Sequence, residues 1–549
     1  MAWRAALALV VTGLVVGAPA AAAPRAKPKP APAPRGWLVD RVRVEPVGDS
    51  ILGVHGVGDY RGALELVAAG NGGVGVVNDL GLDDYLKGLS EVPSTWPAEA
   101  LKAQAIAART YALHERSVTV ATAARALGAD ICATDACQVY TGLAKERGPN
   151  GPAWAAAVEA TSGQALLYRD APILAKYSSS NGGQTVSGGR PYLRAAPDPD
   201  DAHSPLHRWR SSIPASTVAA VVGLPADTRI TRVSRMADST VVLERIEHDG
   251  SVAPAFTIPA VDFRARLNAA VPAPADLPLA VPSNRFSVAY DNGADAVVVD
   301  GRGWGHGIGM SQYGALGKAL RGMRAEDILA SYYGGLRPVA VPAQSLPPTI
   351  KVAVDLGRPT AAVVGSGAFR VLDQSGAPLA VFTGGPWEVV PAGKGKLRIV
   401  PPPGQDAVPA VHPHAVAALQ PGSAPELTFD VSTPAAVEVA VVAPGATAPT
   451  VLGAARLVAA GPVTQSLPPL STPGRYTVTI TADAGGGRRA TATVEFEVHP
   501  PTDASAAAPA AATLPNGPAA PRSPGFLALA AAAALALAAV GLDAARRLH

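Results

Sequence analysis

Charged residues are scarce in this sequence. Only 16% of its 549 residues are Asp, Glu, Lys or Arg, and the formal net charge at pH 7 is +3. No basic cluster stands out along the chain. Because a protein that binds nucleic acid normally carries a basic patch, nucleic acid is not expected as a partner.

Cysteine is almost absent. The two that occur, Cys132 and Cys137, are separated by four residues. In an exported chain a lone C-x4-C pair is typical of a small disulfide loop. A metal site is the alternative, but it would need two more ligands, and no histidine or further cysteine lies inside the loop. Pairing of the two thiols would also leave no cysteine nucleophile.

Small and β-branched residues take the place of charge. Hydrophobic residues make up 48% of the chain, with 56 glycines and 53 prolines. Valine-rich runs punctuated by glycine favour strands and tight turns over long helical bundles. Gly70, Gly72 and Gly75 fit G-x-G-x-x-G, but no helix pattern follows them, so we predict a hairpin there.

Both ends of the chain are apolar. Arg4 precedes an apolar run at 5–17 and a small-residue stretch that ends near Ala23, which predicts a secretory signal peptide. Near the other end, residues 526–542 form an apolar run just long enough to span a bilayer, with two arginines after it. We therefore predict an exported protein anchored to the cell membrane by a C-terminal helix. An alanine-rich surface helix is the alternative.

The stretch from Ser90 to Leu113 organises the chain. It reads SEVPSTWPAEALKAQAIAARTYAL and places Glu91 in a proline-framed turn before an alanine-rich helix. An acid held at the start of a packed helix can be partly desolvated and aimed, as a general acid requires. A capping or surface glutamate is the alternative. Gln104, Arg109 and Tyr111 could line a groove on this helix, or serve only in capping and surface contacts.

Three further blocks combine polar side chains with tight turns. Residues 130–142 read DICATDACQVYTG and hold Gln138 and Tyr140, and residues 177–185 read YSSSNGGQT, rich in groups that could bond to sugars. Residues 301–314 read GRGWGHGIGMSQYG, with His306, Ser311 and Gln312. Glycine at nearly every second position there means that the backbone is tightly turned or closely approached.

Other hydrolase classes fit the sequence less well. Ser311 lacks the G-x-S-x-G spacing of a nucleophile elbow. Ser178, Ser179 or Ser180 could act with His306 and one of Asp198, Asp200 or Asp201, but nothing in the sequence fixes that geometry. A metallohydrolase would need a dense set of His and Asp ligands, which His203, His207 and His306 do not provide on their own. A single-acid lyase fits better, since a lytic transglycosylase can use the sugar's own C6 hydroxyl in place of a second carboxylate.

Residues 78–335 resemble the stage II sporulation protein D / LytB family, known by its SpoIID domain. The resemblance rests on four blocks in the same order: VVNDLGLDDYLKGLSEVPSTWPAEALKAQAIAARTYAL, DICATDACQVYTG, YSSSNGGQT and GRGWGHGIGMSQYGALGKAL. It implies an α+β domain of mixed helices and sheets and a peptidoglycan-directed protein. Catalytic members are lytic transglycosylases, and others enhance cell-wall amidases without cutting glycan.

The resemblance also assigns roles to residues. The catalytic acid of the family is the glutamate of an E-x-P turn, here Glu91, which would protonate the oxygen leaving MurNAc and then accept the proton of its C6 hydroxyl. The products would be 1,6-anhydro ends on glycan stripped of stem peptides. The predicted glycan contacts are Gln104, Arg109, Tyr111, Gln138, Tyr140, Tyr177, Ser178, Ser179, Ser180, Asn181, Gln184, His306, Ser311 and Gln312.

Some relatives bind zinc near the cysteine block with histidines as further ligands. Here Ala136 stands directly before Cys137, where such relatives can have histidine. A disulfide between Cys132 and Cys137 is therefore the first choice and zinc the second, and no other cofactor or metal is expected. The expected partners are peptidoglycan glycan strands, the membrane and, for the enhancer alternative, a cell-wall amidase.

We predict eight segments along the chain. They are a signal peptide (1–23), a Pro/Ala-rich spacer (24–36), a SpoIID/LytB-like domain (37–345), a β-rich module (346–415), an Ig-like β-sandwich (420–500), a disordered stalk (501–524), a transmembrane helix (525–542) and a cytoplasmic tail (543–549).

Overall fold

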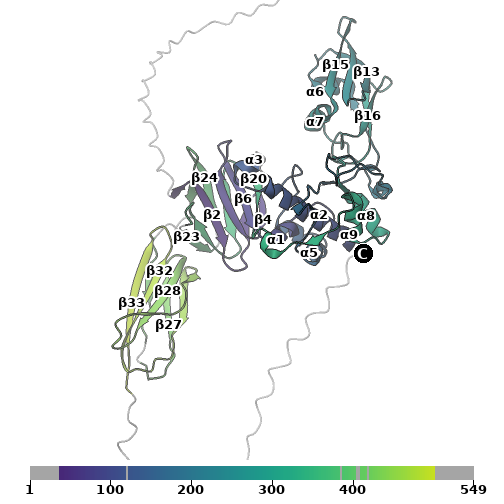
Figure 1. Cartoon of the computed structure of the whole chain (residues 1–549). Coiled ribbons are helices and arrows are strands. Elements are labelled where there is room, and N and C mark those ends of the chain that lie inside the picture. The colour runs from purple at the N-terminus through teal and green to yellow at the C-terminus, as the bar shows by residue number, and fades with distance from the viewer. Residues whose placement is uncertain are drawn as a thin grey trace, which may run out of the picture. The chain divides into compact units, whose positions relative to one another are not determined.

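The computed structural model describes residues 36–118, 122–376, 378–383, 386–402, 408–416 and 419–500 (Figure 1). The predicted signal peptide, stalk, transmembrane helix and cytoplasmic tail lie outside these residues, as does nearly all of the spacer. Among the helices of the described ranges, none is long and apolar enough to cross a bilayer.

Strands dominate the described residues, which contain thirty-three strands and nine α-helices. About 20% of the described residues are helical. The predicted α+β class is wrong because it gave the helices too much weight. The α-helices of the SpoIID-like part lie in two stretches, 82–160 and 312–332, and in the inserted segment at 215–222 and 260–270, whereas the valine-rich segments elsewhere mostly form strands.

Two sheets share the first core. One has the order β23 (Pro378–Thr383), β22 (Ala368–Leu372), β2 (Arg41–Pro46), β5 (Ala63–Ala68), β6 (Val74–Leu80), β20 (Ile350–Arg358) and β7 (Ile131–Cys132). The other has the order β1 (Trp37–Val39), β25 (Lys396–Val400), β24 (Trp387–Gly393), β21 (Ala361–Gly365), β3 (Leu52–Val54) and β4 (Gly58–Tyr60). Buried valines and leucines from both sheets pack together.

This topology corrects a predicted boundary. We expected a separate β-rich module over 346–415, but strands between 350 and 400 complete the sheets that the N-terminal strands begin. β20 pairs with β6, and β25 pairs with β1, as Figure 1 shows for β6 beside β20. β5 and β6 pair as a hairpin around the glycines at 70–75, as predicted.

Helices pack beside these sheets. They are α1 (Leu82–Lys87), α2 (Ala98–Ser117), α3 (Ala123–Ala126), α4 (Leu143–Arg147), α5 (Gly151–Ala160), α8 (Gln312–Leu320) and α9 (Ala325–Tyr332). The short elements are β8 (Gln164–Ala165), β9 (Leu167–Tyr168), β10 (Ala171–Pro172), β11 (Tyr177–Ser178), η1 (Pro199–His203), β18 (Met310–Ser311), β19 (Val339–Ala340) and η2 (Ala343–Ser345). The alanines of α2 are buried on several sides, which lets neighbouring elements approach the helix closely.

Residues 209–301 form a lobe with its own core. Its elements are β12 (Trp209–Pro214), α6 (Ala215–Val222), β13 (Arg229–Arg235), β14 (Thr240–Ile246), β15 (Val252–Pro259), α7 (Ala260–Ala270), β16 (Phe286–Asp291) and β17 (Ala296–Gly301). Three strands, β12, β17 and β16, form one sheet, and β13, β14 and β15 form another. The lobe is inserted between the polar turn at 177–185 and the glycine-rich loop at 301–314.

The last described part has a third core. Its strands are β26 (Val411–Pro413), β27 (Glu426–Val431), β28 (Ala435–Val442), β29 (Thr450–Val451), β30 (Arg456–Val458), β31 (Gly461–Ser466), β32 (Gly474–Asp483) and β33 (Arg489–Val498). They form two antiparallel sheets. Alternate residues of β28 and β32 point into the core, which is the pattern of strands with one buried face.

Candidate functional site

The turn that carries Glu91 is fixed to the segment after the cysteines. Ser90 N–H donates to the Val139 carbonyl at 2.8 Å, and Thr141 N–H donates to the Gly88 carbonyl at 2.9 Å. Val139 N–H in turn donates to Glu91 Oε1 at 2.6 Å. The backbone therefore fixes both the turn and one oxygen of the carboxyl.

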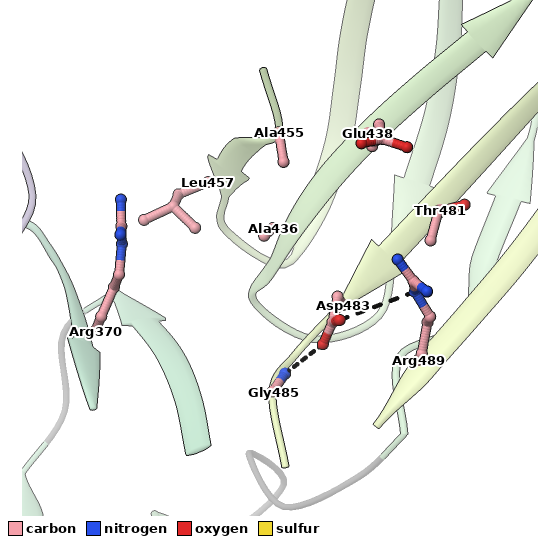
Figure 2. Close-up of a pocket in the computed structure, with 9 residues that line it drawn as sticks. All are labelled: Arg370, Ala436, Glu438, Ala455, Leu457, Thr481, Asp483, Gly485 and Arg489. Atoms are coloured by element: carbon pink, nitrogen blue, oxygen red, sulfur yellow. Dashed lines mark hydrogen bonds and ion pairs between the residues drawn. The ribbon is translucent and has the colours of Figure 1, made fainter. Parts of the chain in front are cut away.

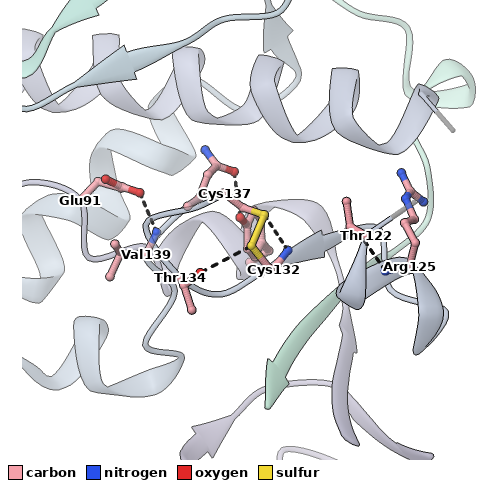
Figure 3. The surroundings of a disulfide bond; sticks show 9 residues. Glu91, Thr122, Arg125, Cys132, Thr134, Cys137 and Val139 are labelled. Atoms are coloured by element: carbon pink, nitrogen blue, oxygen red, sulfur yellow. Dashed lines mark hydrogen bonds between the residues drawn. A yellow bond between two sulfur atoms is a disulfide. The ribbon is translucent and has the colours of Figure 1, made fainter. Parts of the chain in front are cut away.

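A disulfide shapes the loop that supplies this N–H. Cys132 ends β7, and its Sγ is bonded to Cys137 Sγ at 2.09 Å. Figure 3 shows the bridge close to Val139, whose N–H points at the Glu91 carboxyl. Zinc does not fit this arrangement, because the two sulfurs are bonded to each other. Within the described ranges, no group of three or more His, Cys, Asp or Glu side chains is placed to hold a metal ion.

Gln138 links the disulfide loop to the 177–185 turn. Its Oε1 accepts from the Tyr85 hydroxyl at 2.8 Å, and its Nε2 donates to the Tyr177 hydroxyl at 2.8 Å. Gln138 is fully buried. It therefore positions Tyr177 from behind and is not open to a ligand.

The glycine-rich loop lies directly against the 177–185 turn. β11 pairs in parallel with β18, and Ser180 exchanges backbone hydrogen bonds with Trp304. Gly309 has φ +72°, and a Cβ built there would lie 2.0 Å from the Lys176 carbonyl oxygen. Only glycine allows this close approach, so the alternating glycines bring the two blocks together.

These segments enclose a cavity of about 500 Å³. Its walls include Ser90, Glu91, Tyr111, Asp135, Ala136, Cys137, Val139, Lys176, Tyr177, Ser178, Ser179, Arg264, Leu279, Asn284, Trp304, Gly305, His306 and Gln312. The lining combines the partly buried Glu91 and the exposed Asp135 with two basic side chains and with hydroxyl, amide and aromatic groups. Such a lining suits a polar ligand with apolar faces.

The environment of Glu91 favours its protonated form. Burial is the largest effect and raises the pKa of the carboxyl, and the charge of Asp135 raises it further. Hydrogen bonds from Val139 N–H, the Gln312 amide and the Tyr177 hydroxyl oppose this shift. The net result is a pKa above the ordinary value, so Glu91 keeps its proton to a higher pH than a free glutamic acid.

His306 is held in a neutral form. Burial against the cavity wall and the charge of Lys176 lower the pKa of His306 to about 4. Its Nδ1 accepts from Ile308 N–H at 2.9 Å, which leaves Nε2 to carry the proton. The residue as a whole is nevertheless exposed, and its ring also has a hydrogen bond to the Tyr177 backbone, which raises the pKa and partly opposes the shift.

Comparison with known proteins places this site in a family. Residues 70–168 match the SpoIID family, described as Stage II sporulation protein. Stage II sporulation protein D of Bacillus subtilis is 29% identical over 276 residues, which cover 47% of this chain and 74% of the relative. The amidase enhancer of the same organism is 28% identical over 306 residues, or 46% of this chain and 39% of the relative.

The chain therefore contains a SpoIID domain and is similar to proteins of the SpoIID/LytB family. An uncharacterised protein of Brachyspira hyodysenteriae is also similar, at 29% identity over 301 residues, 51% of this chain and 72% of the relative. The family match itself spans Glu91, the disulfide loop and α5, and ends at Tyr168. The SpoIID match therefore includes the acid side of the cavity and not the glycine-rich loop.

Six of the predicted contacts line the cavity together with Glu91. They are Tyr111, Tyr177, Ser178, Ser179, His306 and Gln312. Gln104 lies behind them, where its Oε1 accepts from Gln312 Nε2 at 3.4 Å. Its own Nε2 has no hydrogen-bond partner among the described residues.

Arg109 and Tyr140 are corrected from glycan contacts to core residues. Arg109 is 0% exposed, and its guanidinium donates to Asp83 and to the carbonyl oxygens of Thr161 and Val158. Tyr140 is buried and donates its hydroxyl to Asn78 Oδ1 at 2.7 Å. Both hold neighbouring elements together and cannot touch a ligand in the cavity.

Ser180, Asn181 and Ser311 are also corrected, because they surround the buried Asp201. Ser180 Oγ and Ser311 Oγ donate to its two carboxyl oxygens at 2.8 and 2.6 Å, and Asn181 N–H donates at 2.8 Å. His207 Nδ1 lies 2.9 Å from the same carboxyl. Ser180 is thus bonded to the acid rather than to a histidine, so it does not form the nucleophile–base pair that the serine-hydrolase alternative would need. Gln184 is exposed outside the cavity.

Sequence reasoning missed several cavity residues. Asp135, Lys176, Arg264, Asn284 and Trp304 all line the walls. Asp135 and Trp304 lie inside the polar blocks at 130–142 and 301–314, and Lys176 directly precedes the block at 177–185. Their position next to predicted contacts could therefore have identified them as cavity residues. Arg264 and Asn284 come from the inserted lobe, and no sequence pattern linked them to Glu91.

A second pocket has a different character. Its cavity measures about 320 Å³ and is lined by residues of β22, β28, β30, β32 and β33. Figure 2 shows Asp483 engaged by Arg489 and by the Gly485 N–H. Its remaining side chains include small and aliphatic ones, and its other acid is Glu438. The pocket lacks the aligned acid and polar cradle found around Glu91.

Proposed function

We propose that this protein is a peptidoglycan lytic transglycosylase that cuts glycan strands freed of stem peptides. Its family supports an extracytoplasmic role at the cell wall. The observation that carries the proposal is Glu91, a half-buried acid with a raised pKa on the wall of a polar cavity. Its carboxyl is already aimed by the Val139 N–H.

The proposed reaction needs one acid. Glu91 gives its proton to the glycosidic oxygen as the bond from that oxygen to C1 of MurNAc breaks. The resulting carboxylate takes the proton of the C6 hydroxyl, whose oxygen bonds to C1 and closes a 1,6-anhydro ring. Glu91 ends protonated as it began, and no water is consumed.

The cavity supplies groups that suit a sugar strand. Trp304 is 37% exposed on its wall, and Tyr111 and Tyr177 pack edge to face with ring centroids 6.4 Å apart. Exposed aromatic faces stack on the apolar faces of sugar rings. Gln312, Ser179 and the neutral His306 would bond to sugar hydroxyls.

The test is digestion of amidase-stripped glycan with the purified full chain, followed by mass spectrometry of the ends. Wild type should yield 1,6-anhydro ends, and Glu91→Gln should cut slower by about 10²- to 10⁴-fold. Glu159→Gln is the matched control, because Glu159 is a surface acid paired with Lys87. Glu91→Gln cutting at the wild-type rate would disprove the role of Glu91.

The chemistry of the ends separates two mechanisms. Asp135 is a second carboxyl on the cavity wall, and hydrolysis with two carboxylates would leave reducing ends. Reducing ends that vanish in Asp135→Asn would replace the lytic mechanism with hydrolysis.

A non-catalytic role is the second candidate. The similarity to a protein named amidase enhancer supports it as well as the similarity to Stage II sporulation protein D supports the first. In this case the chain would bind glycan and speed a partner amidase. Acceleration of a cell-wall amidase by Glu91→Gln as well as by wild type, with no new glycan ends, would favour this candidate.

A further inference from the structure

A pocket lined with arginines lies in the part of the chain that joins the inserted lobe to the glycine-rich loop. Its cavity measures about 530 Å³. The walls are formed by Arg208, Trp209, Arg235, Asn284, Arg285, Phe286, Ser287, Asp300, Gly301 and Arg302. Four guanidinium groups therefore face one carboxylate. The four arginines are spread over nearly a hundred residues, so the sequence shows no basic cluster.

That one carboxylate is already engaged. Asp300 accepts from Arg210 through both oxygens, with Nε to Oδ1 at 2.7 Å and Nη2 to Oδ2 at 3.0 Å. Arg210 is not among the residues of the pocket wall. The pocket therefore keeps an excess of positive charge that Asp300 does not neutralise.

Two of the arginines are committed to neutral partners. Arg235 donates to the carbonyl oxygens of Asn284 and Phe286, both at 2.8 Å, and Arg285 donates to those of Asn181 and Gln184. Carbonyl groups position a guanidinium without cancelling its charge. Arg208 and Arg302 are exposed, and within the described ranges their side chains have no hydrogen-bond or ion-pair partner.

The arginines are close enough to repel one another. Burial lowers the pKa of Arg285 and the charge of Arg302 lowers it further, whereas the charge of Asp201 acts in the opposite direction without reversing the shift. Arg235 is also partly buried, with its guanidinium over the Phe286 ring at 4.5 Å from the centroid. Cations held near each other in this way are stabilised by an anion that bridges them.

The arginine pocket adjoins the Glu91 cavity. Asn284 lines both, and Arg285 follows it directly in the chain. A polymer that occupies the cavity can therefore extend a group into the arginine pocket. Because the two sites adjoin, we expect the arginine pocket to bind a group carried by the same polymer that occupies the Glu91 cavity.

We infer that the pocket formed by Arg208, Arg235, Arg285 and Arg302 is an anion subsite that binds a carboxylate or phosphate group borne by the glycan strand in the neighbouring cavity. Guanidinium groups bind both anions through paired N–H donors, which is why the two sources share one chemistry. The choice of a glycan strand rests on the proposed function, whereas the anion subsite itself rests on the arginines.

The test measures binding of wall glycan to the full chain with Glu91→Gln in every sample, so that the polymer stays intact. Four probes separate the sources. One is amidase-stripped glycan with free lactyl carboxylates, and the second is the same glycan after its carboxyls are converted to amides. The third is glycan that keeps a covalently attached polyol-phosphate polymer, and the fourth is that glycan after removal of the phosphate polymer.

The parent chain is the protein with Glu91→Gln alone, and the double variant adds Arg208→Gln and Arg302→Gln. The double variant should bind the probe that carries the recognised anion about tenfold more weakly than the parent chain, because charge-assisted hydrogen bonds are lost. Amidation should abolish the difference from the parent chain if the anion is a carboxylate, and phosphate removal should abolish it if the anion is a phosphate. Arg232→Gln is the matched control. It removes one exposed arginine of the same lobe, paired with Glu244 and outside the pocket.

Three results would overturn the subsite. They are equal binding by the double variant and the parent chain, an equal loss in Arg232→Gln, and no binding of any probe by the parent chain. Arg208 and Arg302 are exposed, so both variants should keep the parent melting temperature. If the double variant loses affinity but the wild-type chain makes no new glycan ends, the subsite stands and the lytic function fails. If the wild-type chain cuts glycan but the double variant binds like the parent chain, the lytic function stands and the anion subsite fails.

Discussion

Glu91 has neighbours that shift its pKa in opposite directions. Asp135 repels the carboxylate and raises the pKa, whereas the Tyr177 hydroxyl donates to the carboxylate and lowers it. A general acid works only while it is protonated, so its pKa sets the pH above which the rate falls. Each neighbour should therefore move that limit in a known direction.

We predict opposite shifts of the alkaline limit in two variants. Asp135→Asn removes a repelling charge, lowers the pKa of Glu91 and should move the decline in rate to lower pH. Tyr177→Phe removes a donor to the carboxylate, raises the pKa and should move the decline to higher pH. The measurement is kcat/KM for glycan cleavage against pH.

Asp249→Asn is the control for this pair, because Asp249 lies in an exposed turn of the inserted lobe. Its profile should match wild type. Shifts of the same sign in Asp135→Asn and Tyr177→Phe would show that Glu91 does not control the alkaline limit.

Residue types in the sequence predicted Glu91 correctly as a cavity residue, but they predicted the other residues of the cavity less well. Glu91, Tyr111, Tyr177 and Gln312 share one cavity, as their polar blocks suggested. Arg109 does not line this cavity, and helix geometry could have predicted that. Arg109 follows Gln104 by five residues, so its side chain points about 140° away from that of Gln104. Tyr111 follows Gln104 by seven residues, about two turns, and returns to the same side of the helix. Asp135 and Lys176 were missed because loops have no period from which to read a face.

At the level of elements, the glycine-rich loop depends on close contact as well as on backbone conformation. Gly309 and Gly322 both have positive φ, +72° and +84°. A Cβ at Gly309 would meet the Lys176 carbonyl at 2.0 Å, whereas nothing lies within 4 Å at Gly322. The two positions therefore separate crowding from conformational strain.

We predict that Gly309→Ala is destabilising by several kcal/mol and lowers activity, because it pushes β18 from β11 and displaces Tyr177. Gly322→Ala should cost only about 1–2 kcal/mol, the strain of a left-handed alanine. Chemical denaturation measures both free energies of unfolding. Equal losses at the two positions would mean that the contact between the blocks does not matter.

The disulfide also holds one element against another, because it closes the loop that leads to Gln138 and Val139. Cys132→Ser with Cys137→Ser should lower the free energy of unfolding by about 2 kcal/mol, the value expected for so short a loop. Activity should fall by more than stability alone explains, since Val139 N–H would lose its fixed position against Glu91. Denaturation and cleavage assays at equal folded fraction measure the two effects.

Wild-type protein treated with a reductant provides the comparison, and it should behave like the double serine variant. Two free thiols in denatured, oxidised wild type would contradict the bridge.

Local patterns predicted elements well. The alanine-rich helix after the Glu91 turn and the hairpin at 70–75 match the residue patterns that predicted them. What they could not predict was pairing across long separations, such as β11 with β18. Two-residue strands of this kind have no pattern of their own and exist only because the partner is present.

On the scale of the molecule, the part after residue 408 has a core formed by its own strands. Every residue of that core lies between Leu427 and Val498. We predict that residues 408–500, expressed alone, fold cooperatively into a β-structure. Circular dichroism and a thermal transition check this, and a chain that stays unfolded would show that it needs the preceding sheets.

The predicted class and boundary failed for a common reason. Alternating strands at 350–400 looked like an independent module, but their buried faces fit the N-terminal sheets, which lack enough strands of their own. A strand pattern records that one face is buried and not which strand covers it. The weight given to helices in 82–160 then produced an α+β assignment for a mostly β chain.

The return of the late strands has a kinetic consequence. Trp37 pairs with Ile399, and Val44 lies between Val371 and Leu64. During synthesis, β1 and one edge of β2 must wait for partners more than three hundred residues away, with apolar faces and open edges exposed. The N-terminal strands are therefore the part of the chain that most needs a chaperone before residue 400 has emerged.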